Sequence, residues 1–133
     1  MSEVTETTTA AGPEPPRPAA PNADQLLRAA AELIASGWSQ NSLAEDKFGR
    51  QVEPWSPRAT GWSPLGALTR VWHERRGVEL EVFETAYAAL ALATGGRPEE
   101  WNGARWRTKR HVLRAFARAR AYLPEAREQI QAG

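Results

Sequence analysis

Apolar side chains recur at the spacing of an α-helix in four separate segments of this 133-residue chain. In each segment they lie three or four residues apart, which collects them on one face of a helix. No segment alternates strictly between apolar and polar residues as a half-buried strand does, although residues 51–53 could form a very short strand. The pattern predicts an all-α fold, a compact bundle of about four helices that bury these faces against one another.

The ends of the first two helices carry recognisable signals. Asn22 and Gln25 have the spacing of a capping box, so we expect the first helix to begin at Asn22 and to end at Gly37. Ser63 is a good N-cap, and Pro64 then occupies the first helical position, where a missing N–H costs nothing. The second helix is expected to stop at residue 77, a glycine.

Two more helices follow in the second half of the chain. The third is predicted over residues 80–93, with Gly95 and Gly96 ending it. Residues 98–101 are expected to form one short turn. Thr108 is the predicted cap of the last helix, which should run to about Leu123, before Pro124.

Residues 38–61 are expected to form a long irregular loop. A short turn of helix is predicted at residues 42–46 and a tight turn at residues 47–49, and two prolines break any regular continuation. A loop of this length in a small domain is either functional or held down by aromatic side chains, here Phe48, Trp55 and Trp62. It also contains half of an apparent duplication, because Gly37-Trp38-Ser39 resembles the residues at positions 61–63. A true repeat and a coincidence of helix-start chemistry are both open.

The two ends of the chain are predicted to lie outside this domain. Residues 1–21 are rich in Pro, Thr and Ala with almost no apolar bulk, which favours a disordered tail. An extended proline-rich docking peptide is the alternative. The helical domain is expected over residues 22–123, and residues 124–133 are expected to form a frayed C-terminal segment.

Composition excludes several kinds of chemistry. The chain has no cysteine, so disulfides and thiolate catalysis are impossible. No apolar run is long enough to span a membrane and no secretory signal is visible, so we expect a cytoplasmic protein without a membrane partner. His73 and His111 are the only histidines and lack the spacing of a helical metal site. We therefore expect no metal, no cofactor and no catalysis; an enzyme with a polar pocket at Asn102 and Thr108 is the weakest of three hypotheses.

The charge is unevenly distributed along the chain. Residues 101–133 contain eight basic and two acidic side chains, whereas residues 1–100 contain nine and 14, which gives net charges of +6 and −5. Basic residues on the last helix could contact phosphates, which makes nucleic-acid binding one functional hypothesis. The alternative is a solvated face paired with the Glu-rich third helix. The candidate nucleic-acid contacts are Arg105, Arg107, Lys109, Arg110, Arg114 and Arg118.

Our first hypothesis, ahead of nucleic-acid binding, is a non-catalytic binding module that engages a protein partner. The chain contains six tryptophans, most of which we expect to pack in or beside the core. The expected partner surface consists of Phe48 and Trp55 in the long loop together with Trp106. Trp106 lies between two arginines, where an indole ring can anchor an interface or stack on a base, or can pack onto the start of its own helix.

The order of several motifs resembles that of a known family. These motifs are Gly37-Trp38-Ser39-Gln40, Gly49-Arg50, Trp62 with residues 65–68, Trp101-Asn102, and residues 107–113. Over about residues 24–122 the chain resembles the small proteins of actinobacteria and their phages grouped as domain of unknown function 6197. The resemblance implies a small helical fold and no particular activity. Members often carry Cys where this chain has Ser63 and Asp where it has Gly103, so an acid-dependent chemistry at the latter position should be missing here.

Overall fold

The computed structural model describes residues 21–132, so the predicted tail lies outside the described residues except for its last residue. Six helices and one two-stranded antiparallel sheet occur in this part of the chain. Their bounds are α1 Ala23–Ser36, β1 Ala44–Glu45, β2 Gly61–Trp62, α2 Pro64–Glu74, α3 Leu80–Thr94, α4 Pro98–Asn102, α5 Lys109–Ala121 and α6 Leu123–Ala132. The predicted all-α class is thus confirmed, with a minimal sheet added to it.

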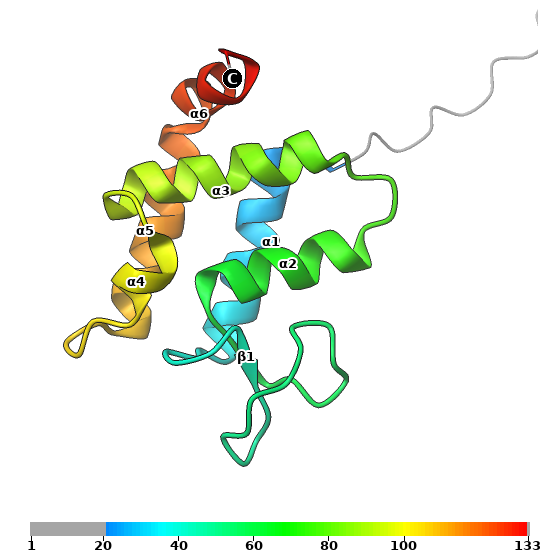
Figure 1. Cartoon of the computed structure of the whole chain (residues 1–133), viewed down its shortest axis with the longest axis vertical. Coiled ribbons are helices and arrows are strands. Elements are labelled where there is room, and N and C mark those ends of the chain that lie inside the picture. The colour runs from blue at the N-terminus through cyan, green and yellow to red at the C-terminus, as the bar shows by residue number, and fades with distance from the viewer. Residues whose placement is uncertain (1–20, 133) are drawn as a thin grey trace, which may run out of the picture.

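The four long helices form two crossing pairs. Figure 1 shows α2 and α3 running across α1 and α5, with the loop around β1 protruding at one end and α6 at the other. Each of these four helices buries its apolar face where they cross, and burying one large apolar side chain contributes roughly 1.5–3 kcal/mol. The largest fully buried apolar side chains are Leu26, Leu27, Ile34, Leu68, Leu90, Val112 and Phe116.

The predicted helix starts are confirmed by their hydrogen bonds. The Asn22 side chain accepts from the Gln25 N–H and the Gln25 side chain accepts from the Asn22 N–H, which completes the capping box. Ser63 Oγ accepts from the Gly66 N–H at 3.0 Å. Thr108 caps α5 in the same way, and Gly95 ends α3 with a φ of 86° that glycine adopts without strain. Helix α2 ends at Glu74, two residues before Arg76, the last helical residue that a stop at Gly77 predicts.

The prediction of a frayed segment after residue 123 is wrong. Helix α5 ends at Ala121, and a new helix, α6, begins at Leu123 and packs against α3. Pro124 stands in its first turn, where the absent N–H has no helical partner to lose. Leu123 and Ala126 are buried, so the domain continues to Ala132.

The predicted turn of helix at residues 42–46 is also wrong. Residues 44 and 45 instead form β1, which pairs with β2 in register Ala44 to Trp62. The tight turn at residues 47–49 is confirmed, and Gln51 makes a single bridge to Glu45 in place of a strand. Pairing with β2, which is distant in the sequence, outweighs the local helix propensity of these residues.

The two similar Gly-Trp-Ser segments lie side by side. Trp38 and Trp62 form a parallel bridge, in which the Ser39 N–H donates to the Trp62 carbonyl and the Trp62 N–H donates to the Gly37 carbonyl, both at 3.0 Å. A Cβ at Gly37 would overlap the carbonyl of Thr60, so only glycine fits this approach. The likeness therefore coincides with a direct contact that ties the start of the loop to its end.

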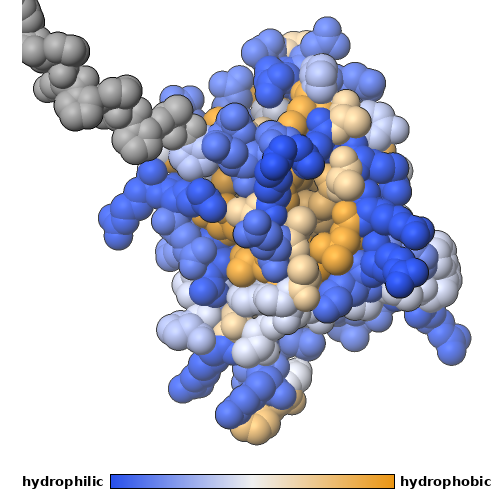
Figure 2. Space-filling view, turned by 180° about the vertical axis from the view of Figure 1, so that it is seen from behind, coloured by the Kyte–Doolittle hydropathy of each residue, from blue (hydrophilic) through white to orange (hydrophobic). Residues whose placement is uncertain are grey.

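The face seen from behind in Figure 2 has hydrophobic residues gathered in its middle, with hydrophilic residues around them. Half-buried apolar side chains of α1 and α5 that pack against the core include Leu33 and Leu113. The large exposed apolar side chains lie elsewhere, in the long loop and at the ends of helices. They are Leu43, Phe48, Trp55, Leu80 and Trp106.

Candidate functional site

The tip of the long loop is built around the carboxylate of Asp46. Its Oδ1 accepts the N–H groups of Phe48 and Arg50, both at 2.9 Å. The Asp46 N–H donates to the Arg50 carbonyl at 2.9 Å, and Gly49 closes the turn with a φ of 78°. These bonds fix the backbone on both sides of Phe48.

The Asp46 carboxylate is held in its ionised form. The backbone N–H of Arg50 contributes most to lowering its pKa below the usual range, the N–H of Phe48 adds to this, and the Arg50 guanidinium acts in the same direction. Arg50 Nε lies 3.4 Å from Asp46 Oδ2. The only acidic side chain at the tip is thus committed to holding the loop together.

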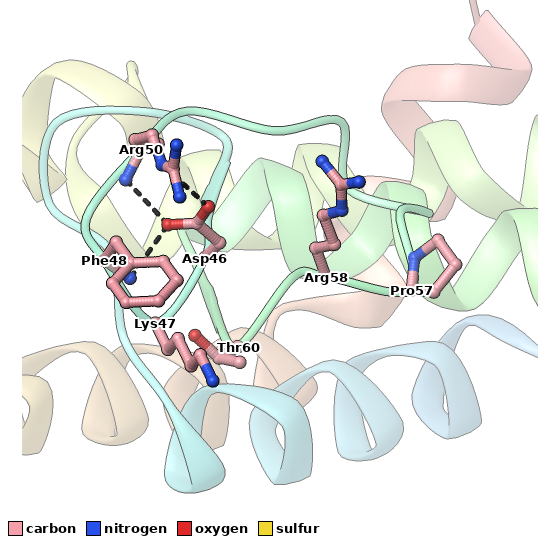
Figure 3. A pocket seen from close by; sticks show the side chains of 7 residues that line it. All are labelled: Asp46, Lys47, Phe48, Arg50, Pro57, Arg58 and Thr60. Atoms are coloured by element: carbon pink, nitrogen blue, oxygen red, sulfur yellow. Dashed lines mark hydrogen bonds and ion pairs between the residues drawn. The ribbon is translucent and has the colours of Figure 1, made fainter.

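Cations surround the ring that this turn displays. The Phe48 side chain is 68% exposed, with Lys47 Nζ 5.1 Å and the Arg50 guanidinium carbon 4.9 Å from its ring centroid. Figure 3 shows these side chains with Arg58 on the neighbouring stretch of the loop. The whole set, here called the loop tip, lines a cavity of about 500 Å³ and consists of Asp46, Lys47, Phe48, Arg50, Pro57, Arg58 and Thr60.

Trp55 lies on a separate part of the same loop. Its ring is 43% exposed and stacks on His73 of α2, with the ring centroids 5.3 Å apart. It lines a second, shallow groove together with Leu43 and Val52. Beneath it, the Trp62 indole N–H donates to the Pro54 carbonyl at 3.0 Å, so buried Trp62 pins this stretch as the sequence predicted.

Asn102 fastens the loop to α4. Its Oδ1 accepts from the Trp38 indole N–H at 2.7 Å, and its Nδ2 donates to the carbonyls of Ser39 at 3.0 Å and Gln40 at 3.3 Å. The side chain is 1% exposed. We call this set the Asn102 clamp. Both Nδ2 hydrogens and Oδ1 of Asn102 are hydrogen-bonded within the protein, and Thr108 Oγ1 caps α5.

Trp106 is held at the start of α5 by an arginine. The Arg107 guanidinium carbon lies 3.8 Å from the Trp101 ring centroid and 4.0 Å from that of Trp106, and Arg107 Nε donates to the Trp101 carbonyl at 2.8 Å. We call these three residues the tryptophan–arginine stack. Burial lowers the pKa of Arg107, yet an arginine remains charged in proteins. Trp106 is 66% exposed, and its ring lies nearly perpendicular to that of His111 with the ring centroids 5.7 Å apart.

The six predicted nucleic-acid contacts divide into two groups. Arg107, Lys109 and Arg118 donate to backbone carbonyls of the protein, those of Trp101, Ala35 and Ala93. Arg105, Arg110 and Arg114 are exposed and make no ion pair within residues 21–132. The expected pairing with the acidic third helix is absent from the same residues.

The predicted partner residues Phe48, Trp55 and Trp106 make separate contacts in the structure. Each ring makes its own contacts, and no aromatic contact among the described residues joins any two of them. Sequence reasoning missed Lys47 and Arg50, which flank the Phe48 ring, and Arg58, which lines the same cavity from a later part of the loop. Asp46 before a Gly-containing turn was the available signal.

Residues 21–132 contain neither a cluster of candidate metal ligands nor a helix that could span a membrane. No group of three or more His, Asp or Glu side chains lies close enough together to hold a metal ion. None of the helices in this part of the chain is both long and apolar enough to cross a membrane.

The described residues thus define a small helical protein with a hydrogen-bonded loop and two separately displayed aromatic rings beside cations. Residues 18–122 match the model of a family of unknown function, DUF6197, and the chain belongs to that family. No curated protein matches the chain. No solved structure matches it either.

Proposed function

We propose that this protein is a non-catalytic binding module that engages a protein partner through the loop tip. One observation carries the proposal: a Phe48 ring, 68% exposed, is held outward by a turn whose only carboxylate is consumed internally. Exposed aromatic rings on a fixed backbone are the residues that contribute most to protein interfaces. The order of the turn also reduces the entropy that binding would otherwise cost.

The cations at the tip specify the chemistry of the partner. Lys47, Arg50 and Arg58 surround the cavity, and the Asp46 carboxylate that could offset them is engaged by two N–H groups and Arg50. A partner segment with acidic side chains beside an apolar one would complement this arrangement. Charges at a rim mainly accelerate association and select the partner, whereas the buried ring supplies affinity. A cytoplasmic location and an actinobacterial or phage source remain parts of the same proposal.

A photoreactive phenylalanine analogue placed at position 48 would identify the partner, with the same group at Arg76, an exposed position just after α2, as a control. Calorimetry with the purified partner would then compare variants. Phe48→Ala should weaken binding by about 30-fold or more, as expected for a residue central to an interface. Lys47→Glu with Arg58→Glu should slow association and reduce its salt dependence.

The matched control is Arg75→Glu with Arg76→Glu, which changes the net charge equally at exposed positions outside the tip. It should leave affinity unchanged. Full affinity in both loop-tip variants would show that the partner binds elsewhere. Trp55→Ala tests whether the interface extends to the groove beside His73. A loss of affinity in this variant would add Trp55 to an interface that is centred on Phe48.

A further inference from the structure

Trp106 belongs to another surface on which an exposed aromatic ring lies beside cations. Residues 101–124 contain seven basic side chains and no Asp or Glu. Among the described residues, only Arg120 of these seven forms an ion pair, with Asp24 of α1 at 2.6 Å. The start of α5 and its outer face therefore carry positive charge that the protein does not neutralise.

The cations on this face form a regular row. Arg110 and Arg114 are exposed, and Arg118 continues the row while donating to the Ala93 carbonyl. Residues four apart on a helix rise by about 6 Å and stay within one side of it. The buried side of α5, which includes Val112 and Phe116, faces the core, so the row points to solvent.

Trp106 stands at the beginning of this row as a flat, pre-positioned ring. The guanidinium of Arg107 covers it at 4.0 Å, and Arg107 is itself fixed against Trp101 and its carbonyl. The ring is nevertheless 66% exposed, which leaves area for a further planar group. The stack consequently presents an indole whose position is set before any ligand arrives.

We propose that Trp106 and the arginine row of α5 form a binding site for single-stranded nucleic acid. An unpaired base would stack on the Trp106 indole while the following phosphates contact Arg110 and Arg114. A ring at the surface reaches only unstacked bases, so a duplex offers it nothing comparable. The repeating spacing of the cations suits a repeating anion, and the site is independent of the loop tip.

The test is fluorescence anisotropy with an end-labelled oligothymidylate and a duplex of the same length across a salt series. The single strand should bind more tightly than the duplex. Trp106→Ala should weaken its binding roughly 5- to 100-fold, the range for loss of one stacked base, and Trp106→Phe should restore most of the affinity. Arg110→Ala with Arg114→Ala should lower the slope of log affinity against log salt by about 1.4, which corresponds to two phosphate contacts.

Two controls separate this site from general attraction to positive charge. Arg75→Ala with Arg76→Ala removes equal charge elsewhere and should leave the slope unchanged, and Phe48→Ala should leave affinity unchanged. The proposal is overturned by absence of binding at low salt, or by binding that Trp106→Ala does not weaken. Displacement by polyglutamate as effective as by unlabelled oligonucleotide would equally overturn it, because the site would then recognise acidic peptides. Thermal unfolding of each variant checks that the fold is retained.

Discussion

The long loop of residues 38–61 and the segment that leads into α5 both display an aromatic ring beside cations, Phe48 and Trp106, but they are ordered in different ways. The loop depends on bonds between distant residues, such as Trp38 to Asn102, which are 64 positions apart. Helix α5 begins with a local capping box of Thr108 and His111 and then follows helical geometry. Buried hydrogen bonds between distant residues can thus hold an irregular surface in place without a helix.

Removing the Asn102 amide should lower the free energy of unfolding more than the other substitutions described below. Asn102→Ala leaves the Trp38 indole N–H and two loop carbonyls without their partner in a site that is 1% exposed. An unsatisfied buried polar group costs about 1–3 kcal/mol, so we expect a total loss of roughly 3 kcal/mol in the free energy of unfolding, measured with urea. Asn41→Ala, an exposed amide in the same loop, should change it little. Equal effects of the two variants would mean that the clamp does not hold the loop.

The second long-range contact is the close approach of the Gly37 backbone to that of Thr60, and glycine substitutions test it. Gly37→Ala would place a Cβ against the Thr60 carbonyl and separate the paired Gly-Trp-Ser segments, with an expected loss of about 2–3 kcal/mol. Gly103 is the matched control because its Cβ would meet only ordinary contacts at 3.6 Å and its φ is −79°. Urea unfolding should therefore show Gly103→Ala within about 0.5 kcal/mol of the parent. A tolerated Gly37→Ala would show that the pairing gives way easily.

The N-caps of α2 and α5 show the effect of burial on one kind of hydrogen bond, because Ser63 is buried and Thr108 is exposed. Ser63 is fully buried, so Ser63→Ala leaves the Gly66 N–H without Ser63 Oγ and without access to water. Thr108 is exposed, and water can replace its hydroxyl. Thermal unfolding should show a loss of about 2 kcal/mol for Ser63→Ala and about 0.5 kcal/mol for Thr108→Ala, the two ends of the range for N-caps. The reverse order would contradict burial as the deciding factor.

These differences also explain how far the sequence could be interpreted. The starts of α1, α2 and α5 were predictable, because a cap and its partner lie within three residues of each other. The sheet of β1 and β2, the Asn102 clamp and the shared cavity of Phe48 and Arg58 were not predictable, because each depends on contacts between residues far apart in the sequence. Helix α6 was missed because Pro124 stops one helix and suits the first turn of the next, and only packing against α3 decides between these roles.

The smallest effect concerns the charge on the Asp46 carboxylate. Its pKa is lowered in the folded protein, chiefly by the Arg50 N–H, so its stabilising contribution is complete above the unfolded value of about 3.9 and is lost as the pH falls through the folded value. Asp46→Asn keeps an oxygen that accepts the N–H groups of Phe48 and Arg50 but cannot titrate. The stability difference between parent and Asp46→Asn should therefore shrink as the pH falls below about 4.

Amide hydrogen exchange at Phe48 and Arg50 separates the charge of Asp46 from its role as an acceptor. Both amides should remain protected in Asp46→Asn and exchange faster in Asp46→Ala, which removes the acceptor altogether. Equal protection in the two variants would mean that the turn is held by its backbone bonds alone, such as the Asp46 N–H to the Arg50 carbonyl. Since those bonds close the same turn, Phe48 would then be presented without help from the carboxylate, and Asp46 would serve mainly to offset the charge of Arg50.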